Sequence, residues 1–341
     1  MVLGFWDLDV PIVGAPMAGG SGTPALAAAV TNAGGLGCLA SGYVSPERLA
    51  DDIAAARAAT TGPIGVNLFV PQPSVAEVHL LDHYAEALDD LAEHYGVEVG
   101  YPKFGDDDGW KQKLEVVADL RPEMVSFTFG APPPDVMRWF GALGMLLFNT
   151  VTSAYEAGIA LAAGADGLIV QGPNAGGHRG TFAPDMDPGT ESLHELLARI
   201  RRSARDVPLI AAGGHGTTED VAAVIDRGAV AAQVGTALLL SDEAGTHAAH
   251  RAALQHPEFI STVVTRAFSG RYARGLENDF TRLFNDVAPL GYPEVNQMTS
   301  PIRKASAALD DPHGTNLWAG TAYRAARTGP AKDVVKTLGD V

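Results

Sequence analysis

The sequence predicts an α/β protein whose fold is a (β/α)8 TIM barrel, with an insertion after the third strand and a C-terminal extension. Eight short, almost continuously apolar runs recur along the chain, as expected for parallel strands buried on both faces. Alanine-rich stretches with helical character separate the runs, and this alternation is typical of a barrel. The predicted strands are Pro11–Ala18, Leu36–Ser41, Pro63–Phe69, Met124–Phe129, Met145–Thr150, Gly167–Gln171, Pro208–Gly213 and Ala231–Leu239.

Several of the predicted helices carry the residues that helix ends require. Ser45 followed by Pro46 provides an N-cap and a proline in the first turn. Gly164 and Gly228 stand where C-capping glycines belong, directly before the next apolar run. The predicted helices are Pro24–Asn32, Pro46–Ala59, Lys111–Leu120, Asp135–Ala142, Ala154–Ala162, Glu191–Ala204 and Thr218–Asp226.

The alternative architecture is an open, doubly wound sheet. That fold carries a G-x-G-x-x-G turn after its first strand. The segment at this position reads Ala18-Gly19-Gly20-Ser21-Gly22-Thr23, which fits that pattern poorly. We therefore favour the barrel.

We divide the chain into a barrel over residues 1–240 and an extension over residues 241–341 that packs over the barrel mouth. The insertion covers residues 71–110 and contains a predicted helix over Val75–Tyr95. The extension begins with a predicted helix over Asp242–Gln255 and continues through an Arg- and Asn-rich stretch, Phe268–Lys304, that we expect to be irregular. A long irregular segment in a compact protein usually has a functional role, for example as a lid over the active site.

Composition narrows the class of protein. The formal net charge of −16 argues against a nucleic-acid partner or an anionic membrane surface. The single cysteine, Cys38, excludes an intrachain disulfide and fits a reducing compartment. The N-terminus, Met1–Pro11, lacks the basic and apolar regions of a signal peptide, and no apolar run has membrane-spanning length. We expect a soluble cytoplasmic protein, and the sequence leaves open whether it is a monomer or a homodimer.

The segment Gln171–Phe182, QGPNAGGHRGTF, is the leading candidate for a catalytic loop. It follows an apolar run directly and surrounds His178 with glycines. Glycine lets the backbone approach a ligand closely, and histidine moves protons near neutral pH. The competing interpretation is a flexible surface loop with an incidental histidine, which the loop alone does not exclude.

The other strand ends exclude several chemistries, because barrel active sites lie at the C-terminal ends of the strands. None of the predicted ends carries a lysine, which argues against a Schiff-base aldolase. None carries a carboxylate cluster, which argues against a divalent-metal site. Cys38 lies away from any Gly-rich loop, which disfavours a cysteine nucleophile. The residues left at the strand ends are amides and glycines. These suit an uncharged cofactor with hydrogen-bonding groups along its edges, such as an isoalloxazine ring.

Two Gly-rich loops predict a phosphate site. Gly213 and Gly214 follow the seventh predicted strand, and Gln233-Val234-Gly235-Thr236 belongs to the eighth. Loops after strands seven and eight form the usual phosphate cradle of a barrel. A single terminal phosphate favours FMN over FAD. The competing interpretation is that these glycines only make tight turns; His215 beside them has a predicted structural or phosphate-binding role.

At this point the sequence resembles the nitronate monooxygenases, formerly called 2-nitropropane dioxygenases, which are FMN-dependent TIM-barrel flavoproteins. The resemblance runs through the whole barrel in order and is close to the streptomycete-type nitroalkane-oxidising members. The matching segments are PIVGAPMAGGSGTPALAAAVTNAGGLG at Pro11–Gly37, GVNLFVPQP at Gly65–Pro73, GADGLIVQGPNAGGHRGTF at Gly164–Phe182, IAAGGHGTTEDVAAVIDRGAVAAQVGTALL at Ile210–Leu239 and YPEVNQMTSPIRK at Tyr292–Lys304.

The resemblance implies a role for each matching position. His178 matches the family's catalytic histidine. The implied cofactor contacts are Ala15, Pro16 and Met17 against the flavin, Asn67 and Gln171 on the ring or ribityl chain, and Gly176, Gly177, Gly213, Gly214, Gln233, Val234, Gly235 and Thr236 around the ribityl chain and phosphate. No metal site is implied. Pro173-Asn174 and His215 depart from the residues common in the family, which affects the expected substrate range.

The implied reaction is oxidation of nitroalkanes or alkyl nitronates by O2 to an aldehyde or ketone plus nitrite, with His178 as the base. Arg179 is either an anion partner of the nitro group or part of a surface or helix-facing ion pair. Tyr292 and Lys304 are expected at the site only because the resemblance implies it. Two alternatives stay open: an NAD(P)H-dependent flavin reductase of the barrel-type enoyl-acyl-carrier reductase kind, and a non-catalytic flavin-binding barrel.

Overall fold

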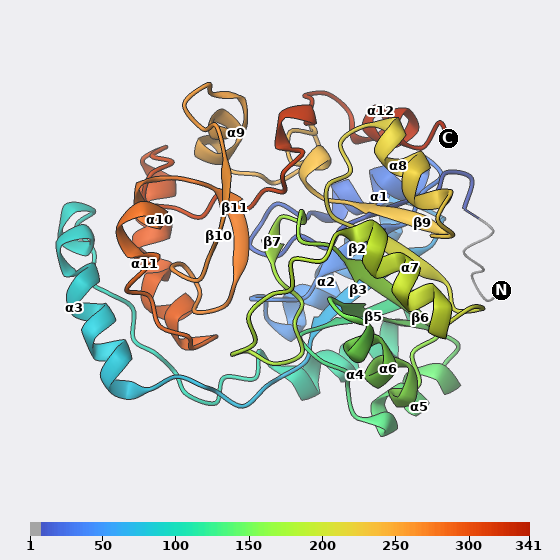
Figure 1. The fold of residues 1–341 in the computed structure, drawn as a ribbon, viewed down its shortest axis with the longest axis horizontal. Helices are drawn as coiled ribbons and strands as arrows, with labels where there is room; N and C mark the ends of the chain where they lie inside the picture. Colours follow the sequence, from blue (N-terminus) through green and yellow to red (C-terminus); the bar gives the residue numbers. More distant parts are fainter. Residues whose placement is uncertain (1–7) are drawn as a thin grey trace.

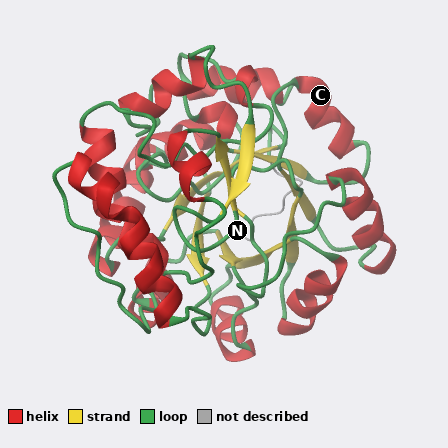
Figure 2. Cartoon of the chain, turned by 60° about the vertical axis from the view of Figure 1, so that its left-hand side comes forward, coloured by secondary structure: helices red, strands yellow, loops and turns green. Residues whose placement is uncertain are grey.

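The computed structural model describes residues 8–341 and confirms the barrel. Eight parallel strands form one sheet in the order β1-β9-β8-β6-β5-β4-β3-β2, and helices surround it (Figure 2). Residues 1–7, part of the N-terminus in which we find no signal peptide, lie outside the described residues. The barrel strands are β1 (Ile12–Gly14), β2 (Gly37–Ala40), β3 (Ile64–Phe69), β4 (Met124–Thr128), β5 (Leu146–Val151), β6 (Gly167–Gln171), β8 (Leu209–Ala212) and β9 (Ala231–Val234).

The sheet closes between its first two strands. Val13 of β1 bridges to Leu36, and the Gly14 N–H donates to the Leu36 carbonyl at 2.9 Å. Buried side chains from the strands fill the interior, Cys38 and Phe148 among them. Burial raises the pKa of the Cys38 thiol to about 12, so this cysteine stays a neutral core residue.

Helices form the outer layer, as the alternating pattern predicts. In the order of the chain they are α1 (Pro24–Asn32), α2 (Pro46–Ala59), α4 (Trp110–Leu120), α5 (Pro134–Ala142), α6 (Ala154–Ala163), α7 (Leu193–Ser203) and α8 (Thr218–Ile225). Ser45 caps α2 by accepting a hydrogen bond from the Arg48 N–H at 3.2 Å. The last helix, α12 (Ala331–Leu338), packs against α1 and α8, so the end of the extension joins the ring of barrel helices.

The insertion and the extension pack together beside the barrel (Figure 1). Leu81 and Leu88 of α3 (Val78–His94) share an apolar core with Phe280 of α10 (Asp279–Phe284) and Met298 of α11 (Glu294–Ala308). A small antiparallel sheet, in the order β10-β11-β7, joins this region to the barrel loops. The remaining elements are β7 (Gly177–His178), β10 (Thr262–Thr265), β11 (Ala273–Leu276), α9 (Ala248–Gln255), η2 (Thr236–Leu238) and η3 (Tyr323–Ala325).

Several sequence predictions about elements were wrong. The predicted strand Pro11–Ala18 ends at Gly14, and the predicted helix Asp242–Gln255 begins only at Ala248. The predicted strand Ala231–Leu239 ends at Val234, because the chain then turns into η2. The stretch Phe268–Lys304 is not irregular, since it contains β11, α10 and most of α11. Its buried side chains recur at helical spacing between polar residues, and Asn278 caps α10 through its side chain. Within residues 8–341, none of the helices has the length and hydrophobicity of a membrane span.

Candidate active site

A cavity opens at the C-terminal ends of the barrel strands, and it brings the predicted site residues together. It is lined by all fourteen candidate residues, with the loop after β1, the ends of β3, β6 and β9, and the Gly-rich loops each contributing part of the wall. Those residues are Ala15, Pro16, Met17, Asn67, Gln171, Gly176, Gly177, His178, Gly213, Gly214, Gln233, Val234, Gly235 and Thr236. Their individual roles remain predictions.

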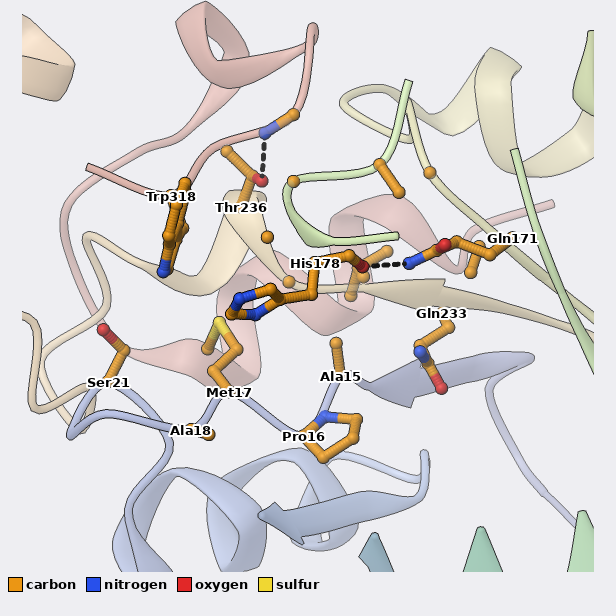
Figure 3. A pocket seen from close by; sticks show the side chains of 18 of the residues that line it. Ala15, Pro16, Met17, Ala18, Ser21, Gln171, His178, Gln233, Thr236 and Trp318 are labelled. Atoms are coloured by element: carbon orange, nitrogen blue, oxygen red, sulfur yellow. Dashed lines mark hydrogen bonds between the residues drawn. The ribbon is translucent and has the colours of Figure 1, made fainter. Parts of the chain in front are cut away.

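His178 lies on β7, and its ring projects into the cavity beside Trp318 (Figure 3). Pairing of β7 with β11 sets its backbone, with His178 opposite Ala273. The Gln171 side chain adds a clamp, because Nε2 donates to the His178 carbonyl at 2.9 Å and Oε1 accepts from the Gly180 N–H at 2.9 Å. Gln171 therefore holds the histidine loop in place, a role that the sequence did not indicate.

The hydrogen bonds around the His178 ring define its tautomer. Nε2 of His178 lies 2.8 Å from Ser269 Oγ, and that hydroxyl donates its proton to the Arg271 carbonyl at 3.1 Å. Because the hydroxyl has only one proton, it accepts at the ring, so Nε2 carries the imidazole proton. Nδ1 then holds the lone pair, which leaves one ring nitrogen able to take up a proton.

Burial and nearby cations lower the pKa of His178 to about 3. Loss of hydration is the largest cause, and the charges of Arg271 and Arg303 add to it. The ring packs among Phe129, Tyr292 and Trp318, with centroids 5.9, 5.6 and 5.5 Å away, and the residue is half-buried and lines the cavity. The imidazole is therefore neutral at physiological pH.

Neither of the two arginines near His178 forms a salt bridge with a described residue, although the Glu156 carboxylate acts on Arg271 electrostatically. Arg271 is 2% exposed, and its guanidinium donates to Gln72 and Thr181 and stacks 4.0 Å from the Phe129 ring centroid. Arg303 donates only to neutral oxygens, including Asn316 Oδ1 at 2.9 Å. No aspartate, glutamate, lysine or arginine belongs to the cavity lining of the described chain. The arginines thus place positive charge beside the cavity that Glu156 balances only in part, which favours an anion.

The loops at one end of the cavity pack backbone against backbone. Gly213 and Gly214 adopt φ values of 108° and 90°, and a Cβ on Gly213 would lie 2.7 Å from the Ala175 nitrogen. Thr236 Oγ1 accepts from the Gly320 N–H at 2.9 Å, which ties the η2 turn to the extension (Figure 3). Both glycines line the cavity, and the absence of side chains there suits the predicted phosphate cradle.

An unpaired acceptor in the cavity wall also fits a flavin. Oε1 of Gln233 is buried in its wall without a hydrogen-bond partner, and a flavin ring offers an imide N–H donor. Asn67 uses its Nδ2 on Ser126 Oγ and Thr128 Oγ1, at 2.9 and 3.0 Å, so its donor is already engaged. Among residues 8–341, no group of three or more His, Cys, Asp or Glu could hold a metal ion.

Other predicted residues lie elsewhere. Arg179 is 2% exposed, and its guanidinium donates to the carbonyls of Gln171 and Gly172. The surface ion-pair interpretation of Arg179 was therefore wrong, and the described cavity lining does not include it. Lys304 borders a separate outer cavity. Tyr292 borders the same outer cavity, but its ring also packs 5.6 Å from the ring of His178.

His215 borders the active-site cavity but is engaged with the backbone. Its Nε2 lies 3.1 Å from the Ala211 carbonyl, to which it donates. Burial is the main cause that lowers its pKa, so the ring is neutral at pH 7. This geometry supports the structural role among those predicted for His215.

Sequence reasoning missed several residues of the cavity wall. Trp318 and Gly320 come from the extension, Ser269 fixes the His178 ring from outside the barrel, and His250 reaches the cavity from α9. No local pattern marks them, because their position depends on how the extension packs. Phe129 was within reach of prediction, since it directly follows the last residue of β4, Thr128, and precedes Gly130.

Fold and cavity together are typical of a barrel enzyme that uses a bound organic cofactor, with His178 as the histidine whose ring projects into the cavity. Comparison with known proteins makes this specific. The family model described as nitronate monooxygenase matches residues 5–340. The chain belongs to the nitronate monooxygenase family, and it is a flavin-dependent oxidoreductase of the kind that oxidises nitroalkanes or nitronates.

Individual relatives agree with the family match. The chain is 38% identical to a nitronate monooxygenase of Pseudomonas aeruginosa, over 97% of this chain and 95% of that one. The crystal structure of a nitroalkane oxidase from Streptomyces ansochromogenes superposes with a TM-score of 0.93 at 44% identity, covering 97% and 95% of the two chains. FabK from Thermotoga maritima is more distant, with a TM-score of 0.76 and 26% identity over 98% of this chain and 93% of that one.

Proposed function

We propose that this protein binds FMN and oxidises nitroalkanes or alkyl nitronates with O2, giving an aldehyde or ketone and nitrite. The observation that carries the proposal is the neutral imidazole of His178 beside a cavity that has positive charge around it and none of its own. Such a site suits a substrate that is neutral on entry and becomes an anion when it loses a proton, or one that enters as the anion.

FMN would be held by neutral groups. Gln233 Oε1 would accept from the ring, Pro16 and Met17 would flank it, and the peptide groups near Gly213 and Thr236 would surround the phosphate. When bound, FMN supplies the electron acceptor for the substrate and passes the electrons to O2.

His178 would remove the α-proton of a neutral nitroalkane through Nδ1. Ser269 supports this role, because it holds the proton of the ring on Nε2. A general base of this kind contributes roughly 10²- to 10⁴-fold to the rate. The lowered pKa keeps the ring deprotonated in the free protein but also weakens it as a base, so the role requires the nitronate formed beside the ring to stabilise the imidazolium.

Arg271 and Arg303 would stabilise the negative charge that develops on the nitro group. Arg271 is buried and Arg303 half-buried, and neither forms a salt bridge in the described chain, so solvent screens their field in the cavity only in part. The same field lowers the pKa of His178 and attracts a nitronate. A nitronate supplied as substrate needs no base, and the histidine then serves to bind the anion.

The test compares the two substrates. FMN-loaded protein should consume O2 and release nitrite with nitroethane and with its nitronate. His178→Ala should reduce kcat/KM for nitroethane by about 10²-fold or more and for the nitronate by much less. His194→Ala, at an exposed histidine on α7, is the matched control and should change neither. Equal losses of kcat/KM on the two substrates in His178→Ala would exclude the base role. If neither nitroethane nor its nitronate gave nitrite, the proposed activity would be contradicted.

A further inference from the structure

A second cavity lies against the active site. The active-site cavity offers about 210 Å³ to water, and this outer cavity offers about 870 Å³. The outer cavity lies between the insertion and α11, where Tyr101 and Lys103 face Gln297 and Lys304. Its volume is far larger than a small nitroalkane needs, and nothing in the proposed reaction uses it.

Aromatic side chains separate the two cavities. Tyr43, Phe69 and Phe129 line both. Their ring centroids are 5.9 Å apart between Tyr43 and Phe69 and 4.7 Å apart between Phe69 and Phe129. Tyr292 completes the wall, 5.5 Å from Phe129, and its hydroxyl donates to the Tyr43 hydroxyl at 3.1 Å. Because Phe129 and Tyr292 also contact the ring of His178, this aromatic wall stands directly beside the proposed base.

Tyr43 is the least constrained member of the aromatic wall. Phe129 is 2% exposed and lies under the Arg271 guanidinium, whereas Tyr43 is 42% exposed. Tyr43 makes its contacts through one ring neighbour, Phe69, and the bond to the Tyr292 hydroxyl. It can therefore be shortened without removing a core side chain.

The backbone beneath Tyr43 is held in an uncommon conformation. Its φ is 68°, in the left-handed region that a bulky residue rarely adopts. The Tyr43 N–H donates to Asp108 Oδ1 at 3.1 Å, and Asp108 pairs at 2.7 Å with Lys113, whose ammonium also donates to the Ser41 carbonyl at 2.8 Å. Such strain persists where the surroundings enforce it, commonly at functional sites. Here Asp108 of the insertion holds the backbone of Tyr43, and with it the point from which the ring enters the wall.

We propose that the ring of Tyr43 sets the upper limit of substrate length by closing the active-site cavity toward the outer cavity. The inference rests on the proposed oxidation of nitroalkanes or nitronates and adds a specificity-determining residue to it. A short alkyl chain fits inside the aromatic wall, and a longer one meets the Tyr43 ring. Removing the ring joins the two cavities and lets a longer chain extend into the outer one.

The test is a chain-length series on FMN-loaded protein. In the wild type, kcat/KM for linear nitronates should stop rising beyond the length that fills the inner cavity. In Tyr43→Ala it should keep rising, by up to about fourfold for each methylene that enters the outer cavity. Isothermal titration with linear carboxylates, from acetate to octanoate, gives the same comparison without turnover, because a carboxylate shares the charge and planar two-oxygen group of a nitronate.

Two variants separate the ring from other effects. Tyr43→Phe keeps the ring and loses the hydroxyl bond, so it should keep the wild-type length limit. Tyr155→Ala removes a tyrosine that is 75% exposed and borders neither cavity, so its profile should match the wild type. The same length dependence in wild type and Tyr43→Ala would overturn the proposal, as would a Tyr43→Phe profile equal to that of Tyr43→Ala. A wild type that binds carboxylates with the expected limit but oxidises no nitronate would contradict the proposed function alone.

Discussion

Turnover of neutral nitroethane should be nearly independent of the protonation of His178 between about pH 5 and pH 8. The pKa of His178 is lowered to about 3, first by burial among aromatic rings and then by Arg271 and Arg303. A group with this pKa stays in its neutral, basic form far below pH 7. The pH dependence of kcat/KM reports the ionisation of groups in the free enzyme, so it measures this property directly.

The expected size of the effect separates a perturbed from an ordinary histidine. With the ordinary pKa of about 6.5, only about 3% of the imidazole is neutral at pH 5, and kcat/KM would fall about thirtyfold from its plateau. With a pKa of about 3 for His178, nearly all of the imidazole remains neutral at pH 5. The decline through this group is then confined to about pH 4 and below.

The assay is initial-rate nitrite release from nitroethane, with circular dichroism at each pH to verify that the protein stays folded. His178→Ala, assayed over the same range, shows which part of any pH dependence comes from the histidine. An inflection near pH 6.5 in the wild type that disappears in His178→Ala would refute the argument, because it would place the base in an ordinary, hydrated environment.

Three further predictions concern stability and cofactor affinity. The pKa of buried His250 is lowered to about 3, so below about pH 6.5 the unfolded chain binds more protons than the folded one. The free energy of unfolding should therefore fall as the pH drops toward 3, by at most about 1.4 kcal/mol per pH unit, and His250→Gln should reduce this slope in urea unfolding. Gly213→Ala should weaken FMN binding by titration calorimetry and cost about 1–3 kcal/mol of stability, because of its positive φ and its contact with Ala175. Asp108→Asn removes the ion pair of buried Lys113 and should cost about 1–3 kcal/mol in urea unfolding.

The barrel could be predicted because its signals are local. Each strand is an almost continuous apolar run, and most joining helices have a side-chain cap, so strand order follows from the chain order and the parallel pairing. The extension gave no such signal. Helix α11 contains Pro301 and many polar residues. Its apolar side chains are buried because α3, which is distant in the sequence, packs against them.

The candidate site divides in the same way. His178 and the glycine loops could be predicted as site residues because they follow strands directly, and the strand ends of a barrel meet at one face. The environment that gives His178 its low pKa could not be read locally. Arg271, Arg303 and Trp318 come from the extension and reach the ring only through tertiary packing. The same holds for Ser269, which fixes the tautomer.

The central claim is that this chain takes electrons from a nitroalkane through a bound FMN. The most direct test is the visible spectrum of the FMN-loaded protein under anaerobic conditions. Addition of nitroethane should bleach the flavin absorbance, and admission of O2 should restore it with release of nitrite. Rapid bleaching by NADH or NADPH, with none by nitroethane or its nitronate, would contradict the account and support the flavin-reductase alternative.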